Sequence, residues 1–227
     1  MSKSDYESLL NRLILDWIES GRPEQESFDW SKGRERWNHE FPKYKKHISE
    51  LPDQLDRNFV RKVFEMEIDV ISKFLTSMIW GYGDRGYGPY RVSKMLEQRN
   101  CKQILGQVLE FGSTGKPLEA YKFLEQNRIR NLGPSFSSKF IYFSTPREVG
   151  APIFDSYIAK WIKYLEIESF ANLSVTSERW NFKAYSEYWR WTREISSRYG
   201  ILPDELELVI FRASETLFSK NSPWERK

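Results

Sequence analysis

One lysine and one aspartate are placed where they could do chemistry on a sugar. Lys139 follows a Gly-Pro-Ser turn that begins at Gly133, and Asp155 comes sixteen residues after the lysine, at the expected start of a helix. A lysine that is kept from water, or that lies close to other cations, loses its proton more easily and becomes a nucleophile. An aspartate facing it could stabilise a positively charged sugar, and the helix dipole would keep that carboxylate ionised.

Both residues also have ordinary interpretations. Lys139 could be a solvated lysine on the surface of a helix. Asp155 could serve only as the N-cap of its helix, a position that favours aspartate in any protein. The two residue types and their spacing leave both interpretations open.

The segment around Lys139 is basic and contains no acid. Residues 126–147 include four basic side chains and no Asp or Glu, and residues 81–154 carry 11 basic and six acidic side chains. A turn between two short helices can direct backbone N–H groups at a phosphate, and basic side chains attract a nucleic-acid backbone of any sequence. A solvated surface with uneven charge is the alternative. The candidate DNA-binding residues are Arg128, Arg130, Gly133, Ser135, Ser137 and Arg147.

A second unusual segment, WGYGDRGYGPY, covers residues 80–90. Its density of Gly and Pro predicts a loop, and its glycines would let the backbone approach something flat or bulky. Its aromatic rings could stack on a base that is extruded from DNA, and its charged residues could read the edge of that base. The alternative is a surface loop fixed by its own aromatic side chains. The candidate base-binding residues here are Trp80, Tyr82, Asp84, Arg85 and Tyr90.

Helical periodicity runs through most of the chain and predicts an all-α fold of about nine or ten helices. Residues 22–52 are polar and aromatic, and we expect a loop with short helical pieces there. No convincing strand pair is apparent. The main expected helices cover about residues 4–18, 56–79, 90–98, 102–111, 118–129, 135–143, 155–165, 177–200 and 203–218.

The totals favour a globular protein of a reducing compartment. The 227 residues suffice for one large domain or two small ones, and 16% of them are aromatic. The single cysteine, Cys101, excludes an internal disulfide and is expected to be buried. His39 and His47 have no cysteine partners, so a metal site is not expected. Without a signal peptide or a long apolar run, the expected location is the cytoplasm.

The segments LGPSFSSK and PIFDSYIAKW together resemble the helix-hairpin-helix DNA glycosylase superfamily, and more narrowly bacterial proteins with an 8-oxoguanine DNA glycosylase fold. In the superfamily a hairpin of the type L-P-G-x-G-x-K supplies a lysine, and a later helix start supplies a catalytic aspartate. By this resemblance Lys139 and Asp155 are the catalytic pair. The hairpin here is one residue longer, and Phe136 or Ser137 stands where a second glycine is expected. The narrower family also shares a segment similar to residues 80–90.

The resemblance implies a single glycosylase domain over residues 1–227, in one or two helical lobes, with the active site in a cleft between lobes. The hairpin and catalytic segment would cover residues 117–165. Phe211, on the last helix, would form one wall of the base pocket. The expected partner is double-stranded DNA with a modified base, bound by a monomer that needs no organic cofactor and no metal.

The sequence leaves three functions open. The first is excision of 8-oxoguanine, with strand cleavage if Lys139 forms a Schiff base, or without it if a water near Asp155 attacks instead. The second is excision of a bulky base, such as glucosylated hydroxymethylcytosine of phage DNA, in antiphage defence. The third is a non-catalytic DNA-binding protein that keeps the glycosylase fold.

Overall fold

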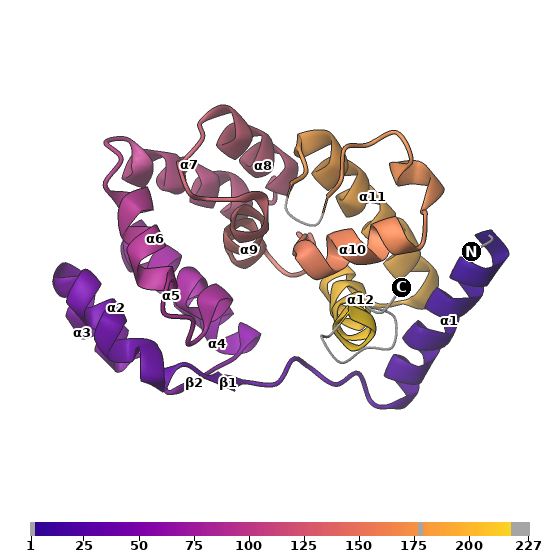
Figure 1. The fold of residues 1–227 in the computed structure, drawn as a ribbon, viewed down its shortest axis with the longest axis horizontal. Helices are drawn as coiled ribbons and strands as arrows, with labels where there is room; N and C mark the ends of the chain where they lie inside the picture. Colours follow the sequence, from indigo (N-terminus) through magenta and orange to yellow (C-terminus); the bar gives the residue numbers. More distant parts are fainter. Residues whose placement is uncertain (1–2, 177–178, 219–227) are drawn as a thin grey trace. The chain divides into compact units, whose positions relative to one another are not determined.

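The chain folds as two compact helical units. The computed structural model describes residues 3–176 and 179–218, and these contain twelve α-helices, three short 3-10 helices and one pair of two-residue strands (Figure 1). The all-α expectation is confirmed, although the described helices outnumber the nine or ten expected. The terminal unit comprises Met1–Glu24 and Arg147–Lys227, and the central unit comprises Gln25–Pro146.

The central unit is built around its last helix. Its elements are β1 (Phe28–Asp29), η1 (Ser31–Gly33), α2 (Arg34–Glu40), η2 (Pro42–Tyr44), α3 (Lys45–Glu50), β2 (Gln54–Leu55), α4 (Arg57–Glu65), α5 (Val70–Tyr82), α6 (Gly88–Leu96), α7 (Cys101–Ser113), α8 (Pro117–Gln126) and α9 (Pro134–Ser144). Helix α9 packs against α4, α5, α7 and α8 (Figure 1). Its residues from Ser137 to Ser144 are all buried, as expected for a helix surrounded by neighbours.

The strand pair corrects the expectation that no strands would form. Strands β1 and β2 are antiparallel, with Phe28 opposite Leu55. Next to them, the Trp30 indole N–H donates to the Pro52 carbonyl over 2.6 Å, and the Trp30 ring is fully buried. The short pair therefore fixes the start of the central unit to the segment that leads into α4.

The prediction of a single long helix over residues 56–79 is wrong, because this segment forms two helices, α4 and α5. Met66 has an extended backbone, with φ −70° and ψ 149°. Asp69 then caps α5 by accepting a hydrogen bond from the Ile71 N–H over 3.0 Å and another from the Ser72 hydroxyl over 2.6 Å. A good N-cap can start a new helix within an otherwise continuous apolar pattern.

The prediction of a loop over residues 80–90 is also wrong at both ends of that segment, because helices extend into it. Helix α5 continues to Tyr82 and α6 already begins at Gly88, so only residues 83–87 connect them. Gly83 ends α5 with φ +59°, a conformation that glycine adopts without steric cost. The other glycines of this segment serve mainly for close packing.

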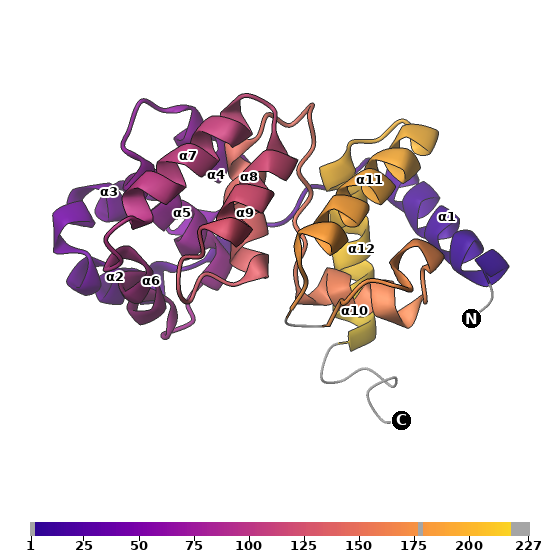
Figure 2. The ribbon, with the colours of Figure 1, turned by 90° about the horizontal axis from the view of Figure 1, so that it is seen from above.

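The terminal unit is built around α12. Its elements are α1 (Lys3–Glu19), α10 (Ser156–Tyr164), η3 (Glu168–Phe170), α11 (Phe182–Tyr199) and α12 (Pro203–Phe218). Helix α12 contacts α1, α10 and α11, and Figure 2 shows it between α10 and α11. No described helix has the length and apolar character that crossing a bilayer requires.

The helix expected over residues 177–200 starts later than predicted. The Asn181 side chain caps α11 by accepting a hydrogen bond from the Ala184 N–H over 3.1 Å, so the helix begins at Phe182. Residues 177–178 lie outside the described part of the chain. The predicted C-terminal end is confirmed, since Gly200 follows α11 in the left-handed conformation, with φ +61°.

Candidate functional site

Lys139 lies in the second turn of α9 and is largely buried. Its residue is 9% exposed, so the interpretation as a solvated surface lysine does not hold. Its Nζ donates a hydrogen bond to the Ser135 hydroxyl, one turn earlier, over 3.0 Å. The same Nζ lies 5.4 Å from the centre of the Phe136 ring, within the range of a cation–π contact. The amine is therefore held in place by its own helix.

Helix α5 supports this arrangement through a glycine and a tyrosine. A Cβ atom on Gly81 would lie 2.8 Å from Phe136 Cε1 and 3.2 Å from Lys139 Cδ, so only glycine allows α5 to approach α9 this closely. The Tyr82 ring stacks on the Phe136 ring, with centroids 4.1 Å apart and planes inclined by 20°. Together Gly81 and Tyr82 form the surface against which Phe136 and the stem of Lys139 rest.

The hairpin before α9 is held by a glutamine from the end of α6. The Gln98 side chain donates to the Arg130 carbonyl over 3.2 Å and accepts from the Arg130 N–H over 2.8 Å. At the other end of the hairpin, Gly133 precedes α9 with an extended backbone and no side-chain cap. The first-turn N–H groups of a helix have no partner within the helix, so they are suited to bind an anion.

The candidate DNA-binding residues divide between the two units. Arg128 and Arg130 are exposed in the hairpin, Gly133 ends it, and Ser135 lies in the first turn of α9. Ser137 instead is buried inside the central unit. Arg147 belongs to the terminal unit, where its Nε lies 3.0 Å from Asp204 Oδ2 and neutralises a carboxylate that is almost fully buried.

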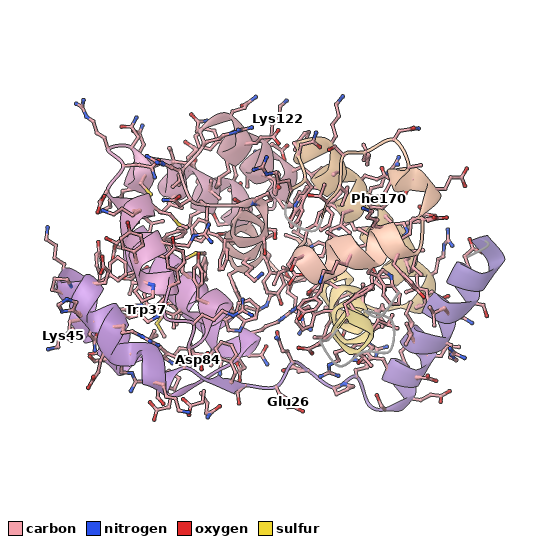
Figure 3. The ribbon with its side chains drawn as sticks, viewed as in Figure 1. Glu26, Trp37, Lys45, Asp84, Lys122 and Phe170 are labelled. Carbon is pink, nitrogen blue, oxygen red and sulfur yellow. The ribbon has the colours of Figure 1, made fainter. Side chains whose placement is uncertain are left out.

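The candidate base-binding residues of segment 80–90 fall into a buried group and an exposed group. Trp80 and Tyr82 are each 7% exposed and belong to α5. The Trp80 ring packs edge-on against Phe143 with centroids 5.1 Å apart, so it forms part of the core of the central unit. Asp84, labelled in Figure 3, lies with Arg85 in the exposed connection between α5 and α6, and Tyr90 lies exposed on α6.

Asp155 is the N-cap of α10, as predicted. Its Oδ1 accepts hydrogen bonds from the Tyr157 N–H over 3.0 Å and the Ile158 N–H over 3.1 Å. The residue is 9% exposed, and Phe154 before it stacks on Trp180 with centroids 4.5 Å apart. The carboxylate is therefore fixed at a helix N-terminus, where the dipole favours its negative charge.

Within the terminal unit, α12 brings Phe211 to the start of α10. The Phe211 ring meets the Tyr157 ring edge-on, with centroids 5.3 Å apart and planes inclined by 79°. Tyr157 is two residues beyond Asp155, so Phe211 lies against the turn that carries the carboxylate. Sequence reasoning missed Tyr157, although its place in the first turn after a candidate catalytic residue was a usable signal.

Metal-ligating side chains and the thiol of Cys101 bear on which cofactors and nucleophiles the chain could use. Among the described residues, no three His, Cys, Asp or Glu side chains are grouped closely enough to hold a metal ion. Cys101 is 1% exposed, which confirms its expected burial, and that burial raises the pKa of its thiol to about 11. A thiol of this kind is a poor nucleophile at neutral pH.

Comparison with known proteins assigns the chain to a family. A family described as "Putative 8-oxoguanine DNA glycosylase OGG-like protein" matches residues 21–211. No curated protein and no solved structure matches the chain. The matched segment includes Lys139, Asp155 and Phe211, and the resemblance to DNA glycosylases is thereby confirmed. The chain belongs to the OGG-like DNA glycosylase family.

Proposed function

We propose that this protein removes a modified base from DNA by breaking the N-glycosidic bond, with Lys139 and Asp155 as its catalytic residues. Membership of the family indicates DNA as the partner and DNA glycosylase activity as the class of reaction. One observation supports the assignment to Lys139 above others. Its amine is largely buried and is oriented by Ser135 and Phe136 on a helix that follows an uncapped hairpin.

Asp155 would act by electrostatic stabilisation. As the bond between C1′ and the base lengthens, positive charge develops on the sugar, and a fixed carboxylate lowers the energy of that state. The two N–H donors that hold Asp155 Oδ1 keep the carboxylate oriented before the reaction begins. Such preorganisation matters because no rearrangement is then needed at the moment of bond breaking.

Lys139 would act as the nucleophile. Its neutral amine attacks C1′, the base departs with the bonding electron pair and takes up a proton, and the sugar ring opens to an imine between Nζ and C1′. Loss of a C2′ proton then expels the 3′ phosphate by β-elimination, and water finally releases the amine. If Lys139 does not attack, a water near Asp155 takes its place and leaves an intact abasic strand.

The hairpin would bind the phosphate backbone of the DNA. The central unit carries 20 basic and 15 acidic side chains, whereas the terminal unit carries 15 and 17, so the positive excess lies on the unit that holds Lys139. Arg128 and Arg130 add attraction to phosphates, and the N-terminus of α9 offers N–H donors to one of them. Because Gln98 fixes the hairpin backbone, these groups keep their positions relative to Lys139.

Each unit, taken by itself, offers groups that could contact an extruded base. Asp84 and Arg85 are exposed between α5 and α6 and can hydrogen-bond to the edge of a base, and Phe211 offers a ring beside Asp155. We assign Trp80 and Tyr82 to the support of α9 instead, because their rings already pack inside the central unit. The proposed substrate is 8-oxoguanine or a bulky base such as glucosylated hydroxymethylcytosine, the latter in antiphage defence. In either case the protein would act as a cytoplasmic monomer.

Borohydride trapping tests the proposal. Duplex DNA carrying 8-oxoguanine, and phage DNA carrying glucosylated hydroxymethylcytosine, are each incubated with the protein and borohydride, and released bases are identified by mass spectrometry. A covalent adduct that is lost in Lys139→Ala supports the lysine mechanism. Base release without an adduct, lost in Asp155→Asn, supports attack by water. DNA binding without base release from either substrate leaves only the non-catalytic alternative.

A further inference from the structure

Two tyrosines at the start of α6 expose their rings to solvent side by side. Tyr87 is 63% exposed and Tyr90 is 50% exposed, and their ring centroids lie 5.8 Å apart. Both are among the few large hydrophobic side chains that the described surface exposes to this extent. Neither ring contributes to the core, since the buried residues of α6 are Gly88, Pro89, Val92 and Met95. Exposed apolar side chains that lie next to each other form a candidate binding surface.

The same face of α6 carries cations next to these rings. The Arg91 guanidinium lies 5.8 Å from the centre of the Tyr87 ring, and the Lys94 amine lies 5.7 Å from the centre of the Tyr90 ring. Residues 85–102 include five basic side chains and one acid, Glu97, which pairs with Lys94 over 2.6 Å. We name Tyr87, Tyr90, Arg91 and Lys94 the α6 stripe.

The α6 stripe is continuous with the hairpin. The Arg91 side chain reaches the Asn131 carbonyl over 3.5 Å, and Gln98, just past the end of α6, holds the backbone of Arg130. At the other end, Arg36 donates to the Asp84 carbonyl over 2.8 Å and so fixes the turn that precedes the stripe. All of these residues belong to the central unit, and the contact of Arg91 with Asn131 joins the stripe to the hairpin.

We propose that the α6 stripe binds unpaired nucleotides of a DNA strand next to the hairpin. Bases within a duplex are covered on both faces by their neighbours, so an exposed tyrosine can stack only on a base that is not paired and stacked already. Arg91 and Lys94 supply the positive charge that the phosphates between such bases require. The proposal rests on the proposed function only in taking DNA as the partner, and it gives Tyr90 a role outside the base pocket.

Fluorescence anisotropy with undamaged oligonucleotides tests the stripe. One probe is a blunt duplex, and the other is the same duplex with an unpaired tail of about six nucleotides, within the usual site size of a stacking surface. We expect the wild-type protein to bind the tailed probe more tightly. The double variant Tyr87→Leu/Tyr90→Leu should bind the tailed probe at least about 25-fold more weakly and the blunt probe as before, because each stacked base contributes about fivefold or more.

Matched controls separate stacking from other effects. Tyr87→Phe/Tyr90→Phe keeps both rings and should keep the preference for the tail, and Tyr164→Leu changes an exposed tyrosine of the other unit and should change nothing. Since both stripe rings are exposed, the leucine variant should unfold at the wild-type temperature.

Three results would overturn the inference: no wild-type preference for the tail, equal weakening of both probes, or unchanged DNA binding in the leucine variant, which would favour a protein partner. Base excision is measured separately on damaged blunt duplex. If the wild type releases no base and still prefers the tail, base excision is contradicted, whereas the binding of unpaired nucleotides by the α6 stripe is supported.

Discussion

Replacing Gly81 by alanine should displace Lys139 while keeping every functional group in the protein. The added methyl would lie 2.8 Å from Phe136 Cε1 and 3.2 Å from Lys139 Cδ, and both distances are too short for carbon atoms to keep. Tyr82 stacks on Phe136 and limits the directions in which that ring can move. The ring and the lysine stem must therefore shift together.

The expected effect on stability is modest. Alanine is favoured over glycine in a helix by up to about 1 kcal/mol. Crowding of a packed contact costs about 1–3 kcal/mol. Because Phe136 is only partly buried and can move outward, we expect a net loss of about 0–2 kcal/mol in the free energy of unfolding.

The expected effect on catalysis is a loss of up to about tenfold, because the Lys139 stem must move by a few tenths of an ångström and a shift of about 1 Å in a reacting group can reduce a rate by about 100-fold. The assay is the single-turnover rate of adduct formation with damaged DNA in the presence of borohydride, measured beside urea unfolding. Gly106→Ala is the matched control, since a Cβ at Gly106 in α7 meets nothing within 4 Å. That variant should be as active as the wild type and slightly more stable. If Gly81→Ala forms adduct at the wild-type rate, the contact between α5 and α9 does not position Lys139.

Three further predictions concern the central unit. Gly112→Ala should lower the free energy of unfolding by about 1–3 kcal/mol, because its Cβ would lie 2.9 Å from the backbone oxygen of Ser144, and wild-type urea unfolding would contradict this. Burial lowers the pKa of His47 below 6.5, so the unfolded chain takes up more protons as the pH falls through that value. The contribution of neutral His47 is therefore present above about pH 6.5 and lost below it, and urea unfolding from about pH 5 to about pH 8 should show a flatter dependence in His47→Gln. Cys101 should react with a thiol reagent only after unfolding, and rapid labelling of the native protein would show that it is accessible.

Features that depend on local sequence were predictable. Asp155 was recognised as an N-cap because capping involves residues two and three positions further on, and both of its bonds are of this kind. Gly200 was likewise recognised as the end of α11. The hairpin and the helix that carries Lys139 were expected from a Gly-Pro-Ser turn followed by an apolar run, which is also a local pattern.

Features that depend on distant contacts were not predictable in this way. Gly81 suggested a loop because it stands among other glycines, whereas its role is to admit Phe136 against α5 from 55 residues further along the chain. The stacking of Tyr82 on Phe136 is of the same kind. Gln98 has no sequence signature at all, since its bonds to Arg130 become apparent only when α6 and the hairpin are adjacent.

The most direct test of the account is to locate the trapped sugar on the protein. Wild-type protein is treated with borohydride during reaction with a damaged duplex, digested, and analysed by mass spectrometry for a peptide that carries the sugar remnant. We expect the remnant on Nζ of Lys139 and a strong decrease in the adduct in Asp155→Asn. A remnant on another lysine, or neither adduct nor base release from any modified DNA offered, would contradict it.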